Sequence, residues 1–280
     1  MPYRPQMSTA SVALTREVRA IDERGRASVI AIPAERPLTV YVDRQELVTL
    51  MTLGAAPEAL TLGYLRNQRL VRSVADVTAI QVDWEVDAVA VTTRHGIADL
   101  AERTQKKVVT TGCGQGSVFG GLMDEIAQIT LPAEARLHQS VLYAIVDTIR
   151  TQPSIYKQAG SVHGCALFSA EGEMLYFVED VGRHNAVDAI AGKMWLDGVE
   201  GADKVFYTTG RLTSEMVIKG GQMGIPFLLS RSGTTQMGHM VAEQLGMTLL
   251  TRCTGKHFLL LTSCERLIAQ PSLADTVRLA

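Results

Sequence analysis

The segment VTTGCGQGSVFGG, residues 109–121, places a single thiol, Cys113, among five glycines. Each glycine costs roughly 0.5–1 kcal/mol relative to alanine in ordered structure, so a thiol that only packs in a core would not need them. Lys106 and Lys107 precede the thiol, and nearby cations favour the thiolate, which is the nucleophile in sulfur exchange. The pattern favours a mobile Cys113 that meets two partners in turn.

Two other interpretations of this segment remain open. It could be a surface turn with an incidental thiol, or a glycine loop that binds phosphate through its N–H groups. The spacing G-x-G-x-G does not match a dinucleotide-binding fingerprint. Of the other cysteines, Cys165 and Cys264 are expected to be packing residues.

Four turns later in the chain place glycine beside cationic side chains, each after an expected strand. They are Arg183 and His184 in FVEDVGRH, Arg211 in YTTGRLTS, Arg231 in LSRSGTT, and Lys256 and His257 in TRCTGKHF.

These turns belong to a region in which expected strands and helices alternate, which favours a parallel or mixed sheet with helices on its faces. At the carboxyl edge of such a sheet, helix N-termini and arginines would converge on a ligand that carries several phosphates. The alternative is structural: Thr213 and Thr234 would cap helices, and each arginine would pair with a carboxylate such as Glu179 or Glu215. No Walker A pattern is present, because Lys256 is followed by His257.

The elements before the glycine-rich segment are expected to be mainly β. Short alternating runs predict strands at 28–33, 37–43, 46–53, 77–83 and 86–93, with a helix at 57–71. An amphipathic helix is expected to follow, with Leu137, Val141, Ile145 and Ile149 on one face. The predicted organisation is a flexible N-terminal segment 1–25, a β-rich region 26–130 with the Cys113 loop at 106–121, an α/β cofactor-binding domain 131–270, and a C-terminal tail 271–280.

The charge balance and composition of the chain exclude several classes of binding partner. A formal net charge of -2 provides no field of one sign to attract nucleic acid or an anionic membrane. No apolar run approaches the length of a membrane span or a signal peptide, so a cytoplasmic location is expected. The four cysteines form no CxxC pair and no disulfide framework, and the histidines have no partners at zinc-site spacing, so no protein-bound metal is expected.

The stretches VTTGCG, EDVGRHNAVDAIAGK, TTGRLTSEMVIKGGQMGIPFLLSRSGTT and TLLTRCTGKHFLLLT together resemble the FdhD family of formate dehydrogenase accessory sulfurtransferases. The resemblance implies a homodimeric carrier that takes sulfur from a cysteine desulfurase. It would deliver the sulfur to the molybdenum bis-guanine-dinucleotide cofactor of formate dehydrogenase. It also implies an α/β (α+β overall) protein whose C-terminal domain is similar to cytidine deaminase, with a smaller, mainly β N-terminal region.

By position, Cys113 matches the persulfide cysteine of the family, and residues 252–257 match its cofactor-binding turn. The family's loop commonly reads Cys-Gly-x-Cys, whereas Gly116 stands in the fourth place here. A non-catalytic cofactor chaperone is therefore the alternative function, and a metal-dependent nucleotide hydrolase is a third. The expected site consists of catalytic Cys113 and the cofactor-binding residues Arg183, His184, Arg211, Arg231, Arg252, Cys253, Thr254, Gly255, Lys256 and His257.

Overall fold

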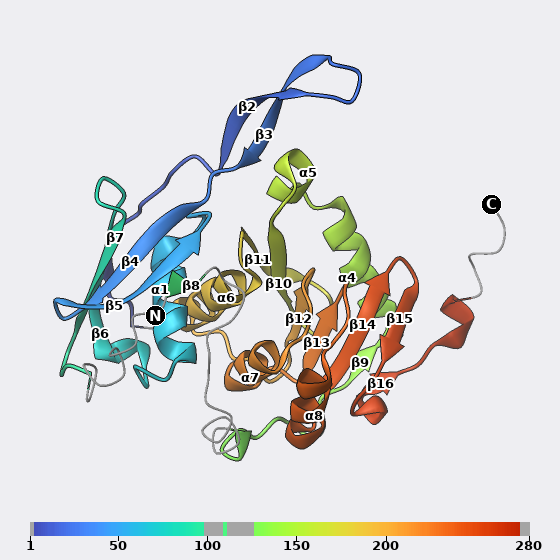
Figure 1. Ribbon diagram of the computed structural model, residues 1–280. Helices are drawn as coiled ribbons and strands as arrows, with labels where there is room; N and C mark the ends of the chain where they lie inside the picture. The colour runs from blue at the N-terminus through green and yellow to red at the C-terminus, as the bar shows by residue number, and fades with distance from the viewer. Residues whose placement is uncertain (1–2, 98–108, 111–125, 275–280) are drawn as a thin grey trace. The chain divides into compact units, whose positions relative to one another are not determined.

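The computed structural model describes residues 3–97, 109–110 and 126–274 (Figure 1). The chain divides into two compact units. Unit 1 consists of Met1–Gln115, Pro153–Gly164 and Val178–Val199, and unit 2 of Gly116–Gln152, Cys165–Phe177 and Glu200–Ala280. The organisation predicted from the sequence had four consecutive parts, 1–25, 26–130, 131–270 and 271–280, whereas each of these units collects several separate segments.

Unit 1 contains a six-stranded sheet in the order β1-β6-β7-β4-β5-β8. Its central strands alternate buried and partly exposed positions, as in β4, where Leu38, Val40 and Val42 are fully buried. The strands predicted between residues 37 and 93 all form, within one or two residues of the expected bounds. The strands are β1 Gln6–Met7, β4 Arg36–Val42, β5 Gln45–Thr52, β6 Val77–Asp83, β7 Ala88–Thr93 and β8 Val109–Thr110.

Helices α1 (Pro57–Asn67) and α6 (Arg183–Asp197) cross in unit 1 with their backbones in contact. A Cβ atom on Gly63 would lie 1.7 Å from the carbonyl oxygen of Asp188, and one on Gly192 would lie 1.9 Å from that of Ala59. Only glycine allows this approach, because any side chain would overlap the facing backbone. The crossing places the EDVGRHN segment in the core of unit 1.

A two-stranded antiparallel hairpin, β2 (Thr15–Ile21) and β3 (Ala27–Pro33), extends away from the strands β4 and β5 (Figure 1). The sequence predicted a strand at β3 and a flexible segment over residues 1–25. The structure instead places β1 and β2 within that segment. The pattern TREVRAI concealed β2, because polar and apolar residues occupy both faces of this strand.

Unit 2 is built on the sheet β11-β10-β12-β13-β14-β15. Strands β12 and β13 run parallel, as do β13 and β14, whereas β10 pairs antiparallel with β12 and β15 antiparallel with β14. The expected mixed sheet is therefore confirmed. The strands are β10 His163–Phe168, β11 Met174–Asp180, β12 Val205–Thr208, β13 Phe227–Ser230, β14 Thr248–Thr254 and β15 His257–Leu260.

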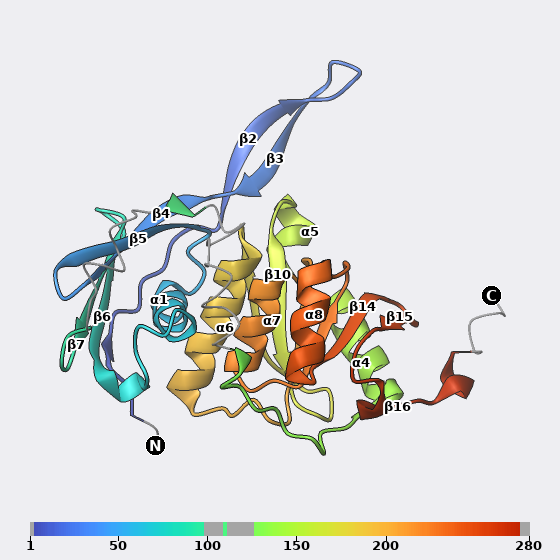
Figure 2. The same cartoon turned by 60° about the horizontal axis from the view of Figure 1, so that its bottom comes forward.

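Helices cover both faces of this sheet (Figure 2). On one face, Leu142 and Ile145 of α4 (Gln139–Thr151) pack in a core with Tyr207 and Leu229. On the other, Gly220 of α7 (Ser214–Gln222) lies against the side chain of Leu228. Helix α8 (Gln236–Leu245) packs beside α7. Because successive strand residues face opposite sides, neighbours such as Leu228 and Leu229 serve different layers.

The remaining elements are short. They are α5 Ile155–Ala159 in unit 1, the strand pair β9 Leu137–His138 and β16 Leu267–Ile268 in unit 2, and 3-10 turns at Val74–Asp76, Cys264–Arg266 and Pro271–Leu273. In the part of the chain that the structure describes, no helix combines the length and apolar character needed to cross a bilayer.

Candidate functional site

Three arginines follow or end the parallel strands of unit 2. Arg211 lies three residues after β12, Arg231 directly follows β13, and Arg252 lies near the end of β14. Because β12, β13 and β14 are parallel neighbours, the three residues lie at the same edge of the sheet. All three are exposed, and within the described residues none of them forms an ion pair. We call these three residues the arginine edge.

Backbone hydrogen bonds hold the three loops of the arginine edge together. The N–H of Arg231 donates to the carbonyl oxygen of Thr208 at 3.0 Å, and the N–H of Arg252 donates to that of Ser232 at 2.7 Å. Arg252 has a φ of 53°, in the left-handed region, at an irregularity in the pairing of β14 with β15. A non-glycine residue in that region carries strain, and strained residues are common at functional sites.

Ser230, the buried last residue of β13, connects two of these loops. Its buried hydroxyl donates to the carbonyl oxygen of Gly210 at 2.7 Å and accepts from the N–H of Ser232 at 2.9 Å. Ser230 was not among the residues predicted from the sequence. The available signal was the pair of serines on either side of Arg231 in LSRSG.

Two helices begin beside these loops and direct their N-termini toward the same edge of the sheet. Helix α7 starts at Ser214, shortly after Arg211, and α8 starts at Gln236. Thr235 caps α8 by accepting from the N–H of Gly238, while the expected cap, Thr234, donates to the carbonyl oxygen of Leu212. The positive ends of the helix dipoles add to the arginine charges, and both favour an anion.

The predicted cofactor-binding turn, residues 252–257, is the hairpin turn between β14 and β15. Thr254 pairs with His257, and Gly255 supplies the positive φ, 56°, that the turn requires. Arg252, Thr254, Lys256 and His257 are exposed, and the Lys256 ammonium donates to the carbonyl oxygen of Leu273 at 2.9 Å.

Cys253 differs from its neighbours in the turn, because its side chain is buried in the core of unit 2. Burial raises the pKa of its thiol to about 12. The thiol is therefore neutral, and its side chain is not part of the exposed surface of the turn.

Arg183 and His184 begin α6 in unit 1 and are 4% and 1% exposed. Their neighbour Asp180 is the centre of a buried network. Its carboxylate accepts from the Thr52 hydroxyl at 2.5 Å and the Asn185 amide at 2.9 Å, and from the N–H groups of Leu53 and Gly182. This network joins the end of β5 to the start of α6.

Burial raises the pKa of Asp180, because the carboxylate loses contact with water. The four hydrogen bonds oppose that shift by stabilising the charged form. Within unit 1, the acidic part of the EDVGRHN segment thus has a structural task. Binding of the cofactor by Arg183 and His184 stays a prediction.

Cys113 lies outside the described residues. Among the described cysteines, Cys165 is fully buried, as expected, with its Sγ 3.4 Å from the hydroxyl of Thr208. The expectation for Cys264 was wrong: it is exposed, because it begins a 3-10 turn at the surface rather than an apolar strand. No three His, Cys, Asp or Glu side chains gather as a metal site in the described ranges.

Comparison with known proteins covers nearly the whole chain. A profile of the FdhD/NarQ family matches residues 33–268. The chain is 30% identical over 255 residues to the sulfur carrier protein FdhD of Saccharolobus solfataricus, which covers 89% of this chain and 96% of that protein. It is 27% identical to the protein of the same name from Listeria monocytogenes, over 85% of this chain and 91% of the relative.

A solved structure has the same fold. It is the crystal structure of a protein assigned as a formate dehydrogenase accessory protein from Desulfotalea psychrophila, with a TM-score of 0.72 and 24% sequence identity. The alignment covers 91% of this chain and 98% of that one. The range matched by the family profile includes the Cys113 loop, α6 and the arginine edge, and the chain belongs to the FdhD/NarQ family.

Proposed function

We propose that this protein is a sulfur carrier that serves formate dehydrogenase. Cys113 accepts sulfur from a cysteine desulfurase as a persulfide, and the sulfur passes to a molybdenum bis-guanine-dinucleotide cofactor that is bound as substrate. The relatives named sulfur carrier protein FdhD support the transfer of sulfur. The solved structure assigned as a formate dehydrogenase accessory protein supports the choice of recipient.

The observation that carries the choice of substrate is the arginine edge. Arg211, Arg231 and Arg252 are exposed at the ends of three neighbouring parallel strands, beside the N-termini of α7 and α8. A guanidinium group matches two phosphate oxygens at once, so three of them fit a ligand with several phosphates. The exposed turn at residues 252–257 would extend this surface with Lys256 and His257. Cofactor binding by Arg183 and His184, at the start of α6 in unit 1, is a separate part of the proposal.

The chemistry needs one thiol. The Cys113 thiolate attacks the outer sulfur of the donor persulfide, whose S–S bond breaks, and the donor cysteine leaves as a thiolate. In the second step the outer sulfur on Cys113 passes to the molybdenum of the substrate. That sulfur takes up two electrons from the metal and becomes a sulfide ligand, while Cys113 leaves as a thiolate. Gly116 therefore does not prevent transfer.

The proposal includes the other partners that the family resemblance implies. A cysteine desulfurase donates the sulfur, two copies of the chain form the working unit, and the reaction takes place in the cytoplasm. The likeness of unit 2 to cytidine deaminase belongs to the same proposal. Its mixed sheet with helices on both faces is compatible with that fold.

Sulfur loading tests the carrier role directly. After incubation with a cysteine desulfurase and cysteine, intact-protein mass spectrometry should find one added sulfur atom on the wild type and none on Cys113→Ser. Cys264→Ser is the matched control, because Cys264 is the exposed cysteine among the described residues. This variant should load like the wild type. Equal loading of the wild type and Cys113→Ser would overturn the proposal.

The rival function, a cofactor chaperone that moves no sulfur, rests on Gly116 in place of a second loop cysteine. A strain that lacks its own accessory protein separates the two functions. Cys264→Ser should restore formate dehydrogenase activity there, and Cys113→Ser should not. Restored activity with Cys113→Ser would favour the chaperone.

A further inference from the structure

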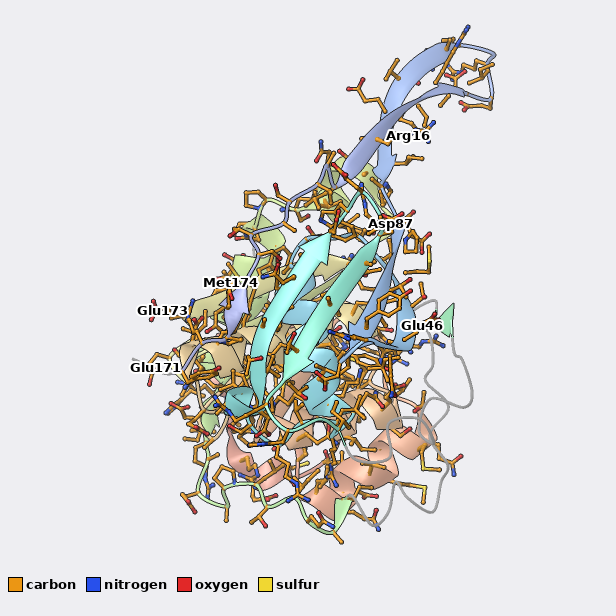
Figure 3. All side chains as sticks on the ribbon, turned by 90° about the vertical axis from the view of Figure 1, so that its left-hand side faces the viewer. Arg16, Glu46, Asp87, Glu171, Glu173 and Met174 are labelled. Carbon is orange, nitrogen blue, oxygen red and sulfur yellow. The ribbon has the colours of Figure 1, made fainter. Side chains whose placement is uncertain are left out.

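The hairpin β2–β3 is a sheet of two strands, and β2 has a free edge within the described part of the chain (Figure 1). Strand β3 contacts α5 within unit 1, whereas the outer edge of β2 is unpaired, and an unpaired edge is a template for another strand. The hairpin also exposes apolar side chains, with Ile21 of β2 at 68% and Val29 of β3 at 67%. Arg16 marks β2 in Figure 3, where side chains project from both faces of the hairpin.

The backbone of the hairpin determines which residues of β2 can pair outward. Hydrogen bonds from Asp22 to Arg26 and from Ala34 to Leu14 bracket a ladder of regular register. Because hydrogen-bonded pairs alternate along an antiparallel ladder, the even-numbered residues of β2 direct their N–H and C=O groups toward β3. The odd-numbered residues, including Glu17 and Arg19, direct theirs toward the free edge.

The sequence TREVRAI is complementary to itself across such an edge. If two β2 strands pair antiparallel about Val18, Glu17 of each lies opposite Arg19 of the other, and both pairs are of the hydrogen-bonded type. Within the described residues neither Glu17 nor Arg19 forms an ion pair, and both are exposed. Opposite charges in directly facing positions stabilise a sheet.

Other registers are disfavoured by the same two residues. A shift of one residue would direct the wrong backbone groups toward the partner, and a shift of two would place Glu17 against Glu17 or Arg19 against Arg19. Parallel pairing in register would also bring like charges together. The charges therefore select a single two-fold arrangement.

The face of the hairpin that carries Val18 and Ile30 is also compatible with this pairing. Val18 faces Ile30 within the hairpin, so the two-fold pairing forms a continuous row of four β-branched residues, Ile30 and Val18 from each copy. Ile30 is 45% exposed in the single chain, and the row would cover part of that surface.

We propose that two copies of this chain associate through the free edges of their β2 strands, antiparallel and centred on Val18, to form one four-stranded sheet. The hairpin carries four arginines and three carboxylates, a nearly even balance that suits a second copy better than a polyanion. The inference rests on the homodimer within the proposed function and is independent of sulfur transfer.

Charge reversal tests the pairing. Glu17→Arg or Arg19→Glu alone places like charges opposite each other in both pairs, so each should weaken dimerisation on the order of ten-fold, measured by sedimentation velocity. The double variant Glu17→Arg/Arg19→Glu restores both pairs and should dimerise like the wild type. An equimolar mixture of the two single variants should also form dimers, because one chain then carries arginine at both positions and the other carries glutamate at both.

Glu23→Arg and Arg24→Glu are matched controls, since they change the same charges in the turn of the hairpin and should leave dimerisation unchanged. A wild type that stays monomeric would overturn both the homodimer and this interface. If the wild type dimerises and the charge-reversal variants dimerise equally well, the proposed interface alone is overturned. Neither result bears on the loading of sulfur onto Cys113.

Cross-linking provides a second readout that does not depend on charge. In the proposed register the two Val18 residues form a non-hydrogen-bonded pair with Cα atoms about 4.5 Å apart, within reach of a disulfide. In a chain with Cys113 and Cys264 replaced by serine, Val18→Cys should give a covalent dimer with diamide as the oxidant, and reductant should reverse it. Ala20→Cys, on the same face but opposite Arg16 of the second copy, should not. Equal cross-linking of both variants, or none of either, would overturn the register.

Discussion

The backbone N–H of Arg252 donates to the carbonyl oxygen of Ser232 at 2.7 Å, which joins the irregular end of β14 to the loop after β13. The donor residue, Arg252, has an exposed side chain and a positive φ of 53°, and the acceptor, Ser232, directly follows Arg231. The exposed charge and the strained backbone thus occur at one residue. Separate measurements of stability and of binding distinguish their effects.

Arg252→Gly should remove the charge and relieve the backbone at the same time. Because a left-handed conformation costs a non-glycine residue about 1–2 kcal/mol, the free energy of unfolding should stay level or rise by up to about 1 kcal/mol. Affinity for guanosine diphosphate, used as a probe of the cofactor's nucleotide arm, should fall about ten-fold with the loss of one charge-assisted contact. Chemical denaturation and calorimetric titration measure the two effects.

Arg44→Gly is the control for that variant. Arg44 also has a positive φ, 73°, in the turn between β4 and β5 of unit 1. The same substitution there should give a similar gain in stability and leave nucleotide affinity unchanged. A loss of nucleotide affinity in both variants would show that binding does not depend on the arginine edge.

Arg211→Ala and Arg231→Ala should each weaken guanosine diphosphate binding and make it less sensitive to salt, because each removes one cation that contacts phosphate. Each variant should show roughly a ten-fold rise in Kd at low salt, with the difference from wild type shrinking as salt increases. Arg150→Ala, on α4 where Arg150 pairs with Asp147, is the comparison that should bind normally. An equal effect of Arg150→Ala would indicate attraction by net charge alone.

Thiol reactivity should separate the described cysteines. In the native protein iodoacetamide should modify Cys264 readily and leave Cys165 and Cys253 unmodified, because the latter two are buried. The pKa of Cys253 is raised to about 12, so its protection should persist at about pH 9 and disappear only on unfolding. Peptide mass spectrometry identifies the modified sites. Fast native modification of Cys253 would show that the turn at 252–257 opens.

Asp180 should make the stability of unit 1 depend on pH. Burial raises its pKa in the folded state, so its contribution to stability is greatest below the pKa of the unfolded chain, about 3.9, and decreases as pH rises through the folded-state value. Asp180→Asn replaces one carboxylate oxygen, which accepts from two buried donors, with an NH2 group. It should cost about 1–3 kcal/mol near pH 4 and less at higher pH. Urea titrations at a series of pH values measure the difference.

Thr52→Val sharpens this test, because the Thr52 hydroxyl donates to the Asp180 carboxylate at 2.5 Å and lowers its pKa. Without this donor the folded-state pKa of Asp180 should rise further, so stability should continue to decrease up to a higher pH. An advantage of wild type over Asp180→Asn that grew with pH would contradict the assigned direction.

Periodic strands and helices could be predicted from the sequence, because burial on one side leaves a repeating apolar pattern. The strands around Val40 and Val89 and the helix with Ile145 show this. The arginine edge could also be placed, since Arg211 and Arg231 follow expected parallel strands. Strand β2 could not, because its pattern reflects no single buried face.

The roles of the buried polar residues could not be predicted from the sequence. Two of the contacts of Asp180, with Thr52 and Leu53, come from the end of β5, more than a hundred positions away in the chain. Ser230 gave no periodic signal, and its role depends on the approach of the loop at Gly210. Cys253 belongs to a cationic turn by sequence, and only the register of β14 shows that its side chain faces the core. Each of these depends on contacts between distant segments.

The winding of the chain through both units has a consequence for any attempt to divide the protein. Helix α6 belongs to unit 1 through its glycine contact with α1, although the strands on either side of it in the sequence contribute to unit 2. A fragment that starts near residue 131 would carry α6 without its counterpart, and an N-terminal fragment would lack it altogether. Neither half could be inherited or exchanged as a module, so the two units must be gained and lost together.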